Sequence, residues 1–61
     1  MTIEDKIREA IQECNTSIDH YTQKIRIIAD DPRQKSLLNI LYEEKRVEQA
    51  KIKLLRRLLH D

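Results

Sequence analysis

The sequence predicts an all-α fold, namely an antiparallel two-helix coiled-coil hairpin. Its 61 residues include no glycine and one proline, and 38% of them are charged, a composition typical of long amphipathic helices. Heptad-spaced apolar residues occur on both sides of the single proline, Pro32. We therefore expect one domain, residues 1–61, with helices over about 3–29 and 32–60 and a turn at 30–31.

The apolar residues of the first helix recur in alternating steps of four and three, which is the spacing of a coiled-coil seam. They are Ile7, Ile11, Cys14, Ile18, Tyr21, Ile25 and Ile28. Thr2 is expected to cap this helix because its hydroxyl can accept a hydrogen bond from the amide three residues on. Glu4 and Asp5 then complement the positive end of the helix dipole.

The turn is predicted from three residues. Asp31 has the side chain of a helix N-cap, Pro32 suits the first helical position, and Gln34 completes a capping-box spacing. Proline also disfavours a helical conformation at the residue before it. The chain is therefore expected to break at 30–31 and fold back on itself.

The second helix is expected to contribute its own heptad row to the seam. This row consists of Leu37, Ile40, Glu44, Val47, Lys51, Leu54 and Leu58. Each member pairs with one residue of the first helix so that the two numbers sum to 65, for example 28 with 37 and 7 with 58, as an antiparallel hairpin requires. The pairing sets Tyr21 opposite Glu44 and Cys14 opposite Lys51, and such polar residues in a seam fix its register. We interpret Cys14 as a small buried hydrophobe, with a reactive thiol activated by Lys51 as the alternative.

A second heptad row lies beside the first and makes the apolar arc of the second helix too wide for one partner helix. We predict that this row forms the interface of an antiparallel homodimer, a four-helix bundle in which Leu41 lies near Leu55 of the other copy. The alternative is a hetero-oligomeric assembly in which a helix of another protein covers the row. The predicted interface residues are Leu38, Leu41, Lys45, Glu48, Ile52, Leu55 and Leu59.

A basic strip is expected on the side of the second helix away from both rows. It consists of Tyr42, Arg46, Gln49, Lys53, Arg56, Arg57 and His60. The strip can be a solvated face, a contact for an acidic protein, or a contact for nucleic-acid phosphates. Residues 1–31 contain seven acidic and four basic side chains, and residues 32–61 contain four acidic and eight basic ones, so the two helices are also expected to attract each other.

The size of the chain, its acidic turn and the inferred dimer resemble those of the Rop family, RNA-binding proteins that control plasmid copy number. The resemblance is one of architecture and extends over the whole chain, and it implies no particular residues. It implies RNA binding as an alternative function.

Several functional classes are not expected for this sequence. It has no pairing of a nucleophile with a base and no glycine-rich phosphate loop, so we expect neither an enzyme nor a small-molecule substrate. Glu44 and Glu48 lack the histidine spacing of metal-binding bundles, so no metal or cofactor is expected. The charged N-terminus and the single cysteine predict a cytoplasmic protein without membrane contact. The sequence predicts a small interaction or regulatory protein that binds another protein, with nucleic-acid binding as the alternative.

Overall fold

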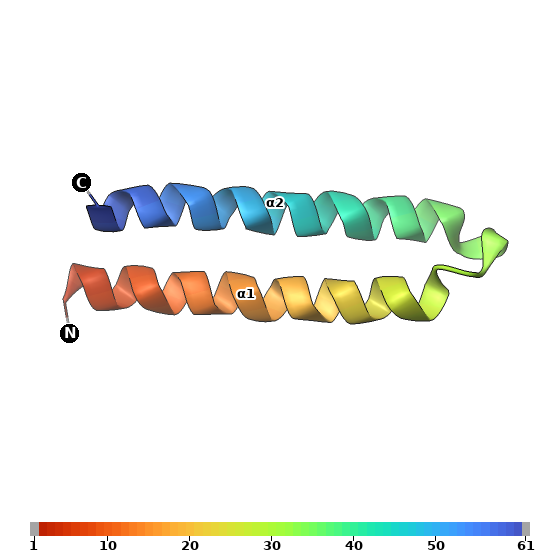
Figure 1. Cartoon of the computed structure of the whole chain (residues 1–61), viewed down its shortest axis with the longest axis horizontal. Helices are drawn as coiled ribbons and strands as arrows, with labels where there is room; N and C mark the ends of the chain where they lie inside the picture. The colour runs from red at the N-terminus through yellow and green to blue at the C-terminus, as the bar shows by residue number, and fades with distance from the viewer. Residues whose placement is uncertain (1, 61) are drawn as a thin grey trace.

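The computed structural model describes residues 2–60 and shows two long helices packed side by side (Figure 1). Helix α1 spans Ile3–Ile28 and helix α2 spans Lys35–His60, and a single 3-10 turn, η1, spans Pro32–Gln34 between them. The helices run antiparallel, so the two ends of the chain lie at the same end of the molecule (Figure 1). The predicted helical hairpin is confirmed.

The start of α1 is fixed by the expected cap. The Thr2 hydroxyl accepts a hydrogen bond from the Asp5 amide at 3.1 Å, and an Asp5 carboxylate oxygen accepts from the Thr2 amide at 3.4 Å. This reciprocal pair is a capping box, which satisfies two amides that the first helical turn leaves without a helical acceptor. The helix therefore begins at Ile3.

The turn is organised by Asp31. Its carboxylate accepts from the Arg33 amide at 3.0 Å and from the Arg33 guanidinium at 3.2 and 3.3 Å. These bonds hold the pKa of Asp31 below its ordinary value of 3.8. The Gln34 amide bonds to the Asp31 carbonyl at 3.0 Å, so the first turn after Pro32 is 3-10 and the α-helix begins at Lys35.

The side of α1 that faces α2 is the predicted one. Cys14 and Ile25 are buried, and the other members of the predicted row are partly buried: Ile7, Ile11, Ile18, Tyr21 and Ile28. Thr22 is also partly buried, and its hydroxyl donates to the Ile18 carbonyl at 2.8 Å.

The side of α2 that faces α1 differs from the prediction. The row assigned to the seam is exposed throughout, and its five aliphatic members have exposed fractions between 43% and 60%. The row assigned to the dimer interface packs against α1 instead. Leu41 and Ile52 are buried at 6% exposure, and the remaining members are partly buried: Leu38, Lys45, Glu48, Leu55 and Leu59. The two rows of α2 were thus assigned the wrong way round.

The reason for this error is that the two rows satisfy the same pairing rule. Pairing α1 with the row that packs against it gives numbers that sum to 66, for example 28 with 38 and 7 with 59, in place of 65. Each row contains five large aliphatic residues and two charged ones, so burial of apolar area does not separate them. The rows differ in the surroundings of their charged residues. Glu48, in the row that packs, is hydrogen-bonded by Lys51 at 3.2 Å, whereas Glu44 and Lys51 are both exposed.

The attraction expected between the helices does not take the form of ion pairs across the seam. Within residues 2–60 every ion pair joins residues two or three positions apart: Lys6–Glu9, Arg8–Asp5, Arg33–Asp31 and Lys51–Glu48. Exposed pairs of this kind contribute less than about 1 kcal/mol each. The hairpin therefore depends on its apolar seam.

Two isoleucines provide a matched test of the seam. Ile52→Ala should lower the free energy of unfolding by about 2–4 kcal/mol, because it removes a side chain that is only 6% exposed and leaves a cavity. Ile27→Ala makes the same change at a side chain that is 81% exposed and should alter it by less than about 0.5 kcal/mol. Urea unfolding followed by circular dichroism measures both values. Equal effects would contradict the observed register.

Candidate interaction surfaces

The structure leaves one heptad row of α2 exposed and without a partner helix in the described chain. We call it the exposed row, and it comprises Leu37, Ile40, Glu44, Val47, Lys51, Leu54 and Leu58. Five of the seven side chains are large and aliphatic, and at 1.5 Å per residue the row is about 32 Å long. Isolated exposed apolar residues are ordinary, but five large aliphatic side chains at heptad spacing on one side of a helix indicate a contact surface.

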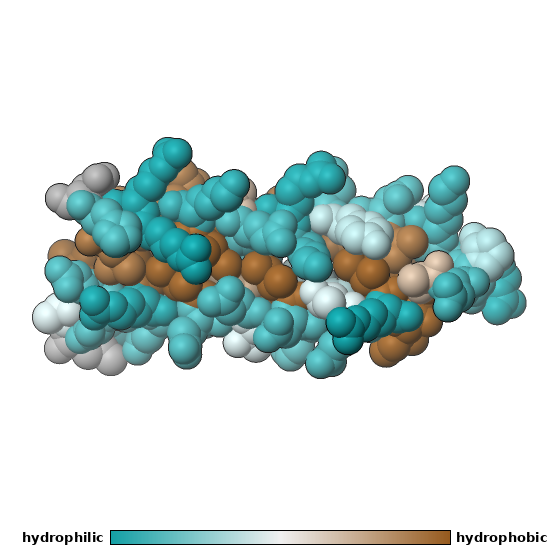
Figure 2. Space-filling view, viewed as in Figure 1, coloured by the Kyte–Doolittle hydropathy of each residue, from teal (hydrophilic) through white to brown (hydrophobic). Residues whose placement is uncertain are grey.

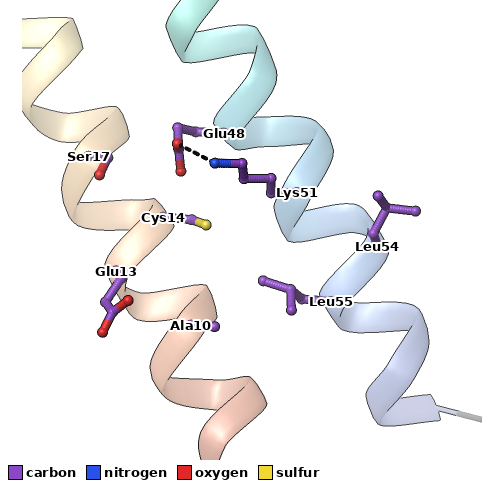
Figure 3. A pocket seen from close by; sticks show the side chains of 8 residues that line it. All are labelled: Ala10, Glu13, Cys14, Ser17, Glu48, Lys51, Leu54 and Leu55. Carbon is purple, nitrogen blue, oxygen red and sulfur yellow. Dashed lines mark hydrogen bonds and ion pairs between the residues drawn. The ribbon is translucent and has the colours of Figure 1, made fainter.

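A shallow hollow of about 480 Å³ borders the C-terminal half of the exposed row. Its lining residues are Ala10, Glu13, Cys14 and Ser17 from α1, and Glu48, Lys51, Leu54 and Leu55 from α2. Leu55 points towards α1, whereas the neighbouring Leu54 points away from it (Figure 3). The hollow exists because Ala10 and Ser17 are too short to fill the space beside the seam.

A small polar cluster lies between the hollow and the seam. The Lys51 ammonium donates to a Glu48 carboxylate oxygen at 3.2 Å, and the Cys14 side chain points towards them from α1 (Figure 3). Hydrogen bonds from the Cys14 thiol and then from Lys51 hold the pKa of Glu48 below its ordinary value of 4.5. The same ion pair raises the pKa of Lys51 above 10.5. Both groups are therefore charged at neutral pH.

Cys14 is held in its protonated form. Burial raises the pKa of its thiol above the ordinary value of 9.0, and the neighbouring Glu48 carboxylate raises it further, while Lys51 opposes this shift. A thiolate is the reactive form of cysteine, so this environment disfavours a nucleophilic or redox role. The structure supports the interpretation of Cys14 as a small buried hydrophobe.

The basic strip is exposed over its whole length. All seven of its predicted residues, Tyr42, Arg46, Gln49, Lys53, Arg56, Arg57 and His60, are exposed. Within the described chain, none of its cations belongs to an ion pair. At 100° per residue, this strip lies on the opposite side of the seam from the exposed row. A shallow hollow of about 490 Å³ connects it to α1 and is lined by Asn15, Ile18, Gln49, Ile52, Lys53 and Arg56.

The apolar surface between α1 and α2 is narrow on the face shown in Figure 2. Apolar side chains form a line between α1 and α2 there, and hydrophilic side chains flank this line on both sides. Over residues 2–60, neither helix has an apolar stretch suited to crossing a membrane. In the same range, no three histidine, cysteine, aspartate or glutamate side chains are grouped closely enough to hold a metal ion.

Comparisons with known proteins add no assignment: no family model, no curated protein and no solved structure matches the chain. The architectural resemblance to the Rop family gains no support from them. Any functional inference must therefore come from the surfaces themselves.

The two predicted groups of site residues have different outcomes in the structure, and one further surface was not predicted. The predicted dimer-interface row is used inside the hairpin, the predicted basic strip is on the surface as expected, and the exposed row was missed as an interaction surface. The signal for the exposed row was present in the sequence, since two rows compete for one partner helix. Only the tertiary structure shows which row packs against α1 and which row remains exposed.

The Glu48 cluster predicts a specific dependence of stability on pH. Because the pKa of Glu48 is lower in the folded chain, its carboxylate stabilises the fold above about pH 4.5, and this contribution is lost as the pH falls through the folded-state pKa. The difference in thermal midpoint between wild type and Glu48→Gln should therefore shrink between about pH 6 and about pH 3.

The control is Glu43→Gln, which removes an exposed carboxylate that belongs to no ion pair in the described chain. The difference in midpoint between Glu43→Gln and wild type should stay near zero over the same range. A constant difference for Glu48→Gln would contradict the role assigned to this cluster.

Proposed function

We propose that this protein is a small protein–protein interaction module that works by binding a helix along the exposed row of α2. The observation behind the proposal is that five large aliphatic side chains lie in one line on a helix whose other apolar row is already covered. Helix-in-groove recognition uses apolar anchors with this heptad spacing.

The energetics support a partner. Within residues 2–60 four residues are buried, Cys14, Ile25, Leu41 and Ile52, which is a small core for a chain of this length. Full burial of one large aliphatic side chain contributes about 1.5–3 kcal/mol to stability. Each aliphatic side chain of the exposed row is already about half covered, so a partner that covers the rest adds about half of that free energy. Five such side chains together contribute about 4–8 kcal/mol for each chain, which offsets part of the cost of association.

The assembly we propose is a helical-hairpin homodimer, a four-helix bundle built on the exposed row. The exposed row thus replaces the interface expected from the sequence. The buried and unpaired Cys14 fits a reducing compartment such as the cytoplasm. A hetero-oligomeric partner that covers the same row is the alternative assembly.

Site-specific photocrosslinking in cells tests the proposed function. A photoreactive residue at Leu54, in the exposed row, should give a discrete protein adduct, either with a second copy or with another protein. The matched control places it at Glu43, which is exposed and lies outside the row, and should give no adduct. Adducts of equal yield at both positions, or none at Leu54, would contradict the proposal.

Nucleic-acid binding is the second candidate, because the cations of the basic strip are exposed and belong to no ion pair in the described chain. If the strip contacts phosphates, the chain should shift RNA or DNA in a mobility assay at low salt, and added salt should weaken the complex. Arg46→Glu with Lys53→Glu should abolish the shift, whereas Lys6→Glu with Lys24→Glu makes the same charge change on α1 and should retain it. No shift at low salt would remove this candidate.

A further inference from the structure

We infer that the helix bound by the exposed row is α2 of a second copy of this chain, packed antiparallel about a two-fold axis at Val47. The inference rests on the proposed function and specifies the orientation and the axis of the proposed homodimer. It follows from the order of residues along the exposed row, from the sign of its two charges and from the position of the adjoining hollow.

The exposed row is nearly the same when read from either end. An antiparallel copy centred on Val47 sets Ile40 level with Leu54 of the other chain, because their numbers sum to 94 as the axis requires. It sets Leu37 within one residue of the level of Leu58 of the other chain, since these numbers sum to 95. Val47 then meets its own counterpart at the axis. Each large aliphatic side chain of the row is thereby covered by another one.

The two charged residues of the row become complementary in this arrangement. Glu44 of each copy lies beside Lys51 of the other, so the dimer contains two symmetry-related pairs of opposite charge. A parallel in-register pair would set Glu44 against Glu44 and Lys51 against Lys51, and like charges at such positions are unfavourable. The charges therefore favour the antiparallel orientation.

The existing contacts of Lys51 are compatible with this role. An ammonium group has three donors, and in the hairpin Lys51 donates to Glu48 at 3.2 Å while 56% of its side chain is exposed. Its ammonium can thus bond to Glu48 of its own chain and to Glu44 of the second copy. Glu48 then positions Lys51 for the contact between the copies.

The hollow beside the exposed row fits the same arrangement. It is bordered by Leu54, which lies next to Ile40 of the second copy in the antiparallel pairing. Ile40 is 56% exposed in the hairpin. In the dimer it can enter the hollow above Ala10 and Ser17, which gives the partner helix a contact with α1 as well as with α2. The basic strips remain on the outer surface, since they lie on the opposite side of the seam.

Sedimentation equilibrium of charge variants tests the inference. The wild-type chain should be a dimer, and Glu44→Lys should weaken the dimer about tenfold or more, because two pairs of opposite charge become pairs of like charge. Glu43→Lys changes the net charge equally outside the row and should leave the dimer intact. The double variant Glu44→Lys with Lys51→Glu makes the antiparallel pairs complementary again and should recover part of the lost association. Recovery is partial because Lys51→Glu also removes the bond to Glu48 of the same chain.

A second measurement reports the orientation without changing any charge. Chains with Leu37→Cys and chains with Leu58→Cys are mixed under mild oxidation, and disulfides are identified by mass spectrometry. A bridge between position 37 of one chain and position 58 of another is expected, with no bridge between like positions. Cys14 stays in place because it is buried.

The inference is overturned if the wild-type chain is a monomer, if Glu44→Lys behaves like Glu43→Lys, or if bridges form between like positions. A monomeric wild type that still crosslinks to another protein through Leu54 overturns the homodimer alone. A monomer without such an adduct overturns the proposed function as well.

Discussion

The constraint on which the rest of the structure depends is that α2 has two apolar rows and α1 has one. Neighbouring rows on a helix are separated by about 100°, so a single partner helix covers only one of them. In the hairpin, α1 covers the row that contains Leu41 and Ile52, and the row that contains Val47 and Leu54 faces outward. The small core and the exposed apolar surface are both consequences of this mismatch.

Much of the fold could be predicted from the sequence. The heptad spacing predicts two helices, Thr2 predicts the start of the first, and Asp31 with Pro32 predicts the turn, because each of these features acts through local geometry. The row of α1 that faces α2 was predicted as well, since α1 offers only one row. The residues of α2 in the seam could not be predicted, because both rows satisfy antiparallel pairing and contain equal numbers of aliphatic residues.

The presence of an apolar contact surface on α2 was therefore predicted, but the surface was assigned to the wrong residues. An apolar row available for another helix was expected on α2, and one is present, but it contains Glu44 and Lys51 in place of Lys45 and Glu48. The distinction depends on tertiary contacts, since Glu48 lies at the seam beside the Cys14 thiol of α1, whereas its bond to Lys51 is local to α2. The exposure of the basic strip could be predicted because the strip is outside both rows and does not depend on which one packs.

The central claim is that the exposed row binds a second copy of the chain and that its burial in this homodimer adds to the stability of the fold. The most direct measurement is the thermal midpoint of the wild-type chain as a function of its own concentration. If folding is coupled to association through this row, the midpoint rises steadily over a hundredfold range of about 1 to 100 μM, because mass action favours the associated folded state. A midpoint that is independent of concentration over this range would show that the hairpin folds as a monomer and would contradict the claim.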